Sequence, residues 1–178
     1  MDLYLIIVII MLALAVLSLI VGVANDAVNF LNSALGSKVA PRYVIMTVAS
    51  VGIIIGALTS SGMMEVARSG VFHPEMFTFS EIMLLFLAVM FTNVILLDIF
   101  NTLGMPTSTT VSLVFGLLGA AVGICVFKIS SGSLATLSDG SQATMSDMIN
   151  TGNAMVIIGG ILLSVVIGIP VGIISAVK

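Results

Sequence analysis

Four consecutive hydroxyl side chains, Thr107, Ser108, Thr109 and Thr110, follow a Gly-Met-Pro sequence between two strongly apolar segments. Pro106 has no backbone N–H and disfavours helix at the residue before it, so a new helix is expected to begin near Thr107 to Thr109. The free N–H groups of its first turn, the helix dipole and the hydroxyls predict an anion site that needs no basic residue. The alternative is a Pro-Thr cap that merely starts the next span, although one cap needs only one hydroxyl.

A second polar group, Asn25, Asp26 and Asn29, lies within the apolar sequence near the N-terminus. Residues three and four apart share a helix face, and carboxylate and amide oxygens are ligands that suit a hard cation. A helix over residues 3–35 would be about 50 Å long, which exceeds the bilayer core. We therefore expect a break near residues 22–25 that frees backbone carbonyls as further ligands. The alternative is that Asp26 marks the membrane–water boundary and the Asn residues cap helices.

Three more polar residues, Asn93, Asp98 and Asn101, lie in the segment that precedes the hydroxyl run. Polar and ionisable groups in membrane spans mark ion paths by default, and Asp98 and Asn101 share a helix face. Hydrolysis by one of the hydroxyls is disfavoured, because the single histidine, His73, lies in a loop beside a proline and no lysine is near the run. We expect no enzymatic activity and no organic cofactor.

The segments that position these residues are apolar enough to cross a lipid bilayer. Hydrophobic residues make up 60% and charged residues 7% of the 178 residues, with a mean hydropathy of +1.33, whereas soluble domains have about 25% charged residues. The net charge of −3 without a basic cluster argues against nucleic-acid binding. The composition predicts an all-α integral membrane protein with broken helices, one domain over residues 1–178, whose apolar segments are residues 3–24, 43–62, 79–103, 108–128 and 154–177.

The distribution of Lys and Arg favours an N-terminus outside the cell (plasma or inner) membrane. Lys38, Arg42 and Lys178 would then be cytoplasmic, whereas Arg68 and Lys128 on the outer side weaken the bias. The long Ser/Gly/Thr-rich segment after the fourth span is expected to be a solvated outer loop.

The two polar motifs together resemble the signatures of the inorganic phosphate transporter (PiT) family of sodium- or proton-coupled carriers. The sequence "GVANDAVNFLNSALGSK" is similar to G-A-N-D-x-x-N, and "TLGMPTSTT" is similar to G-x-P-[VI]-S-T-T-H. The resemblance implies a coupling-cation site, with sodium as the expected ion, at Asn25, Asp26 and Asn29. It also implies phosphate contacts by Ser108, Thr109 and Thr110, at a turn shaped by Gly104 and Pro106.

Two positions depart from the family pattern: Thr107 replaces Val or Ile, and Val111 replaces His. They leave phosphate, sulfate or another oxyanion open as the substrate. The resemblance also implies a second, inverted copy of the motif pair, which residues 150–178 do not begin. We therefore expect this chain to supply one half of a cation-coupled phosphate carrier. A fragment or a half that needs a second transporter half ranks first, and an antiparallel homodimer second. The alternative is a noncatalytic membrane assembly subunit.

Overall fold

The computed structural model describes residues 3–61, 65, 70–105, 107–134 and 141–176. Within these residues, five helices are long and apolar enough to cross a membrane, which confirms the prediction of a helical membrane protein. They are α1 (Leu3–Gly36), α2 (Arg42–Thr59), α4 (Phe79–Thr102), α5 (Thr109–Ser131) and α7 (Thr151–Ala176), with the short turns η2 (Pro74–Met76) and α6 (Met145–Met148) before α4 and α7.

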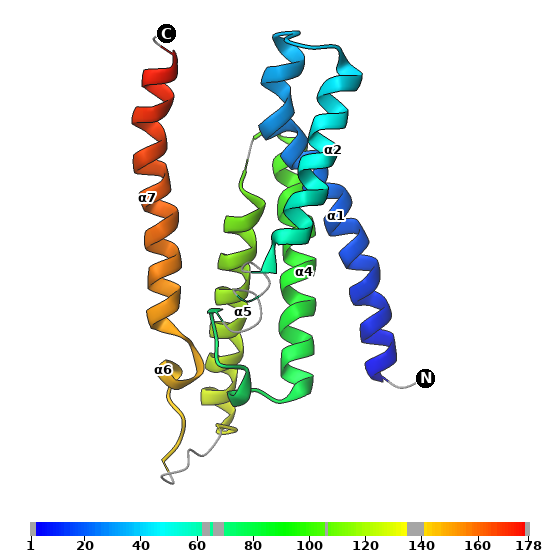
Figure 1. The fold of residues 1–178 in the computed structure, drawn as a ribbon. Helices are drawn as coiled ribbons and strands as arrows, with labels where there is room; N and C mark the ends of the chain where they lie inside the picture. The colour runs from blue at the N-terminus through cyan, green and yellow to red at the C-terminus, as the bar shows by residue number, and fades with distance from the viewer. Residues whose placement is uncertain (1–2, 62–64, 66–69, 106, 135–140, 177–178) are drawn as a thin grey trace.

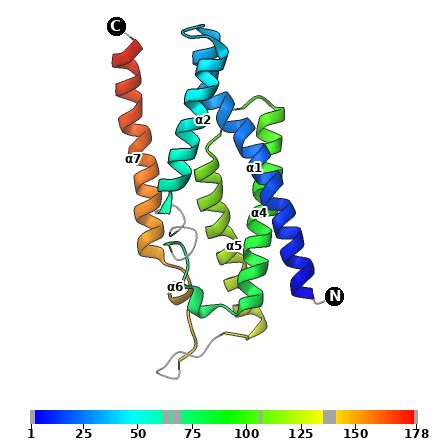
Figure 2. The ribbon, with the colours of Figure 1, turned by 45° about the vertical axis from the view of Figure 1, so that its right-hand side comes forward.

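Helix α4 packs against both α1 and α5, and these three helices position the polar residues (Figure 1). The chain reverses direction from each span to the next, so the two termini lie at opposite ends of the molecule (Figure 2). Helix α2 lies against α1, and α7 stands at the edge of the group. Most side chains of α2 and α7 are apolar and exposed, as expected for surfaces that lipid or a partner helix covers.

Helix α1 is one continuous helix of 34 residues, so the predicted break near residues 22–25 is wrong. The backbone groups of this stretch stay paired within the helix, and its polar side chains bond to groups beyond it instead. A helix of this length is about 51 Å long and must be inclined or extend beyond a bilayer core of about 30 Å. Figures 1 and 2 both show α1 inclined to α4.

The predicted break between the third and fourth spans, α4 and α5, is present. Helix α4 ends in a Schellman motif, in which Gly104 N–H donates to Asn101 O at 3.1 Å and Met105 N–H to Phe100 O at 2.9 Å. Gly104 has a φ of +67°, the left-handed conformation that favours glycine. Helix α5 then begins at Thr109, as expected. Pro106 lies outside the described residues, and so does its predicted role in the turn.

The core lies at the end of α4 and α5 away from this break. Two connecting segments pack there against α4 and α5 and meet in an antiparallel bridge between Phe72 and Ile149. Phe72, Met148 and Ile149 are 1%, 0% and 4% exposed. The prediction of a solvated loop is therefore wrong for the end of the segment before α7, because its Met-Ile pair fills an apolar gap beside the two helices.

Lys128, one of the two charges that weaken the orientation bias, is buried near the end of α5. Its Nζ donates to Glu81 Oε2 at 3.1 Å and to Met76 O at 3.2 Å, and it lies 5.6 Å from the centroid of the Phe77 ring. Glu81 also accepts from the backbone N–H of Thr78 at 2.7 Å and so caps α4. Lys128 thus joins α5 to α4 by an ion pair and to η2 by a hydrogen bond.

Arg68 and Lys178, which also entered the orientation argument, lie outside the described residues.

Candidate functional site

A chain of amide side chains joins α1 to the end of α4. Asn25 is 1% exposed, and its Nδ2 donates to Asn101 Oδ1 at 2.9 Å. Asn101 Nδ2 in turn donates to the carbonyl oxygen of Val21 at 3.1 Å. Because a buried amide is costly unless its groups are bonded, this pairing fixes how α1 lies against the last turn of α4.

Asn29, one turn further along α1, extends the same chain toward α5. Its Nδ2 donates to Asn25 Oδ1 at 3.1 Å and to the carbonyl oxygen of Thr107 at 2.8 Å. Both bonds use the Asn29 nitrogen, so neither engages its side-chain oxygen. The contact with Thr107 places the predicted cation group of α1 directly against the hydroxyl run.

Asp26 makes the second link between the two predicted groups. Thr109 Oγ1 donates to Asp26 Oδ1 at 3.4 Å, from the first residue of α5 to a half-buried carboxylate of α1. Asp26 and Thr109 are 83 residues apart in the sequence. The structure therefore brings together the cation and anion groups that the sequence marks separately.

The start of α5 presents hydrogen-bond donors beside this link. Ser108 is the N-cap, and its Oγ accepts from Val111 N–H at 3.3 Å. The first intrahelical bond runs from Ser112 N–H to Ser108 O at 3.0 Å, so the N–H groups of Thr109 and Thr110 precede it. Together with the positive end of the helix dipole, these donors favour an anion.

A cavity of about 390 Å³ lies in front of these donors. No lysine or arginine is among the described residues that line it, so attraction of an anion depends on hydroxyl and N–H dipoles and on any bound cation. Its lining residues are Asp26, Asn29, Phe30, Thr107, Ser108, Thr109 and Thr110.

A second cavity, of about 410 Å³, is also lined by the Asp26–Thr109 pair. It shares Asp26, Thr109 and Thr110 with the first cavity and reaches Ser18 of α1 and Asn93 of α4. Asn93 Nδ2 donates to Ser18 Oγ at 3.3 Å. Asn93 Oδ1 is shielded from solvent and has no hydrogen-bond partner within the described residues.

The three residues predicted as an ion path have three different environments. Asn93 lines the second cavity, and Asn101 belongs to the amide chain. Asp98 is exposed on α4 and lines neither polar cavity, so its place in an ion path stays a prediction. The sequence reasoning missed Ser18 and Phe30, because a serine or phenylalanine within an apolar helix carries no spacing signal.

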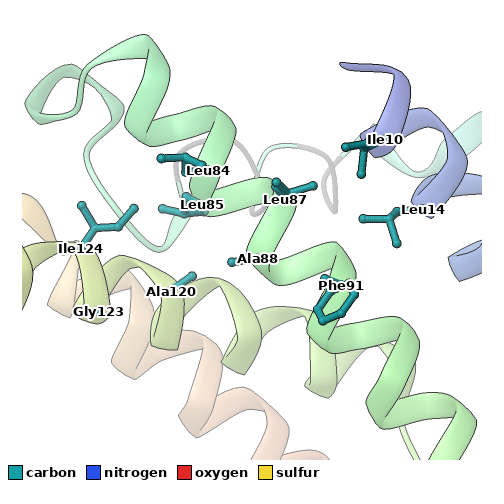
Figure 3. A pocket seen from close by; sticks show the side chains of 10 residues that line it. All are labelled: Ile10, Leu14, Leu84, Leu85, Leu87, Ala88, Phe91, Ala120, Gly123 and Ile124. Atoms are coloured by element: carbon teal, nitrogen blue, oxygen red, sulfur yellow. The ribbon is translucent and has the colours of Figure 1, made fainter. Parts of the chain in front are cut away.

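The third cavity is apolar and lies nearer the N-terminal ends of α1 and α4. It has a volume of about 740 Å³, and its walls come from α1, α4 and α5 (Figure 3). Leu14, Phe91 and Ile124 are among its lining residues, all of which are apolar. Such a cavity offers no ligand to an ion.

The described residues contain no group of three or more His, Cys, Asp or Glu side chains that could hold a metal ion. The polar site instead combines one carboxylate, Asp26, with neutral hydroxyl and amide groups.

The chain has apolar spans, a polar site between them and a helix N-terminus at this site. These features define the class of protein, which is a helical membrane transporter. A sequence model of the phosphate transporter family matches residues 22–177, and the chain belongs to this family. Its function is thus phosphate transport and not enzymatic catalysis, as the two motifs predict. No curated protein and no solved structure matches the chain.

Proposed function

We propose that this chain supplies one half of the site of a sodium-coupled phosphate carrier in the cell membrane, with its N-terminus outside. A second transporter half, or a second copy of the chain, completes the site. Family membership and the two polar cavities beside the start of α5 support this proposal. Phosphate transport alone would not require the carboxylate at Asp26, whereas coupling to a cation does.

In this proposal, the anion lies at the start of α5. The hydroxyls of Thr107, Ser108, Thr109 and Thr110 and the first N–H groups of the helix donate to phosphate oxygens. Hydroxyl and N–H donors hold the anion without a fixed positive charge, so the anion can also leave. Phosphate is thus bound by dipoles, and its net charge is offset only when a cation is bound nearby.

The cation binds at Asp26, which supplies a full negative charge. Asn25 and Asn29 belong to the same site because they hold this turn of α1 against α4 and against Thr107. Sodium fits a carboxylate with neutral oxygens, and a proton on Asp26 is the alternative coupling ion.

The hydrogen bond from Thr109 Oγ1 to Asp26 Oδ1 links the proposed anion and cation sites. Without a cation, the Thr109 hydroxyl donates its hydrogen bond to Asp26, and the negative carboxylate repels the anion. A cation at Asp26 removes this repulsion and frees the Thr109 hydroxyl for phosphate. Two unit charges 4 Å apart interact by about 4 kcal/mol near a protein surface. A bound cation therefore strengthens binding of the anion. A movement of the helices between two access states then carries both ions.

Uptake of radioactive phosphate into liposomes, with an inward sodium gradient or with choline in its place, tests the proposal. The chain is reconstituted alone and with any second half that is encoded beside it. Sodium-dependent uptake is expected in the completed carrier and is lost when Ser108, Thr109 and Thr110 are all replaced by Ala, which keeps helix propensity. Sulfate as competitor identifies the oxyanion. A noncatalytic assembly subunit would give no uptake and no stabilisation by either ion.

A further inference from the structure

We propose that the coupling cation occupies the second cavity, where Ser18, Asn93 and Asp26 supply its oxygen ligands. This assignment rests on the proposed function and deepens it by naming two ligands outside both motifs. The anion occupies the first cavity, and Asp26 and Thr109, which line both cavities, contact both ions. Cation and anion thus bind in neighbouring cavities that share Asp26 and Thr109.

The chemistry of the cavity selects a cation. Its polar lining consists of one carboxylate, three hydroxyls and one amide, and no lysine or arginine is among its described residues. The remaining walls are apolar side chains such as Leu19, Leu97 and Leu113. In such low-dielectric surroundings, an uncompensated carboxylate is costly and attracts a small cation strongly.

The two amides of the first motif do not line this cavity. Asn25 is buried and uses both its Oδ1 and its Nδ2 in bonds to other side chains. Asn29 holds the Thr107 carbonyl through Nδ2. A cation that recruited Asn25 Oδ1 would compete with the hydrogen bond from Asn29 Nδ2, whereas a cation beside Asn93 leaves this bond in place.

Among the described residues, Asn93 has a side-chain oxygen that is free to bind a cation. A polar atom without a partner inside a membrane helix bundle costs free energy unless another state of the protein satisfies it. Asn93 Oδ1 is such an atom in the described structure, on a residue that lines the cavity. The terminal torsion of asparagine is soft, so the amide can rotate and turn this oxygen toward a cation. Ser18 Oγ, freed from Asn93 Nδ2, then becomes a further ligand.

The test uses sodium binding by the full chain in detergent, because this cavity is formed by the chain itself. Thermal unfolding is followed at increasing sodium chloride, with choline chloride keeping the ionic strength constant. Asn93→Leu and Ser18→Ala should each raise the sodium concentration for half-maximal stabilisation by about tenfold, the effect of losing one polar contact to a charge. Asn93→Asp should lower it, because a second carboxylate strengthens cation binding. Asn32→Leu, at an exposed asparagine of α1, is the matched control.

The opposite effects of Leu and Asp at residue 93 separate a ligand from a packing role, since a merely structural asparagine would be damaged by both. Wild-type sodium dependence in Asn93→Leu and Ser18→Ala would overturn the cavity assignment. An absence of sodium stabilisation in the wild-type chain would overturn it as well. Sodium-driven uptake by the completed carrier would in either case leave the proposed function standing, whereas uptake without sodium dependence would overturn the proposed function itself.

Discussion

Asn29 Nδ2 donates to the carbonyl oxygen of Thr107 at 2.8 Å, so a side chain of α1 holds the residue that leads into α5. This bond places the proposed anion site at the start of α5 against the turn of α1 that carries Asp26. A shift of α1 relative to α5 therefore changes the geometry of both ion sites together.

Asn29→Ala should weaken phosphate binding about fivefold, because one hydrogen bond contributes about 1 kcal/mol and its loss releases the backbone before the first turn of α5. The measurement is the phosphate concentration for half-maximal uptake by the completed carrier. Asn32→Ala, on the exposed face of the same helix, should leave this value unchanged. Wild-type phosphate affinity in Asn29→Ala would contradict a role for this contact.

Asn25 and Asn101 should behave as one unit in stability. Either Asn25→Leu or Asn101→Leu leaves the other amide without its side-chain partner and should cost about 1–2 kcal/mol. The double variant replaces both amides by apolar groups and should cost less than the sum of the single changes. Thermal unfolding of the four proteins in detergent gives the coupling energy. Purely additive costs would show that the amide pair does not hold α1 to α4.

Asp26→Asn should weaken sodium dependence more than it weakens folding. Asparagine keeps the size of the side chain and an acceptor for Thr109 Oγ1, but it removes the charge that holds a cation. The expected result is a folded protein whose unfolding temperature no longer rises with sodium. If Asp26→Asn kept wild-type sodium stabilisation, the cation would not bind at this carboxylate.

The Lys128–Glu81 ion pair should contribute to stability and not to ion binding, because Glu81 lies in the first turn of α4 and Asn101 of the polar site in its last turn. Lys128→Met leaves the Glu81 carboxylate partly buried and should cost about 3 kcal/mol, at the low end for broken buried pairs. Glu81→Gln in the same protein should restore part of this loss. The sodium concentration for half-maximal stabilisation should not move in either variant; a shift would place the pair in the transport mechanism.

The sequence predicts the spans and the turn between α4 and α5 well, for physical reasons. Long apolar segments have few alternatives to membrane helices, and the Gly104 turn followed by Ser108 and Thr109 has the residues that end one helix and cap the next. From the spacing of Asn25, Asp26 and Asn29 we expect one helix face; Asn29 bonds to Asn25 and lines the first cavity with Asp26.

The continuity of α1 and the partners of its polar residues could not be predicted. Helix length alone favours a break, but the partners that satisfy Asn25 and Asn29 come from residues 76 and 78 positions away. The burial of Lys128 depends on Glu81, which lies on another helix. Such contacts depend on how helices pack, and a local pattern in a single sequence does not predict them.

The proposed ion site is completed either by a different second half or by a second copy of this chain. A cysteine at position 107 reports on self-pairing, because the residue lines the first cavity and its contact with Asn29 uses only the backbone carbonyl. Cys125 is 0% exposed within the apolar core, so Cys125→Ala is the suitable background.

In an antiparallel homodimer that shares one site, the two Thr107→Cys residues would approach within the roughly 7 Å between Cα atoms that a disulfide allows. We expect no such bridge in the detergent-solubilised chain, and sodium-dependent uptake only when a different second half is present. Ser37→Cys, on the exposed turn after α1, controls for random collisions. A bridge specific to Thr107→Cys, together with uptake by this chain alone, would show instead that two copies form the carrier.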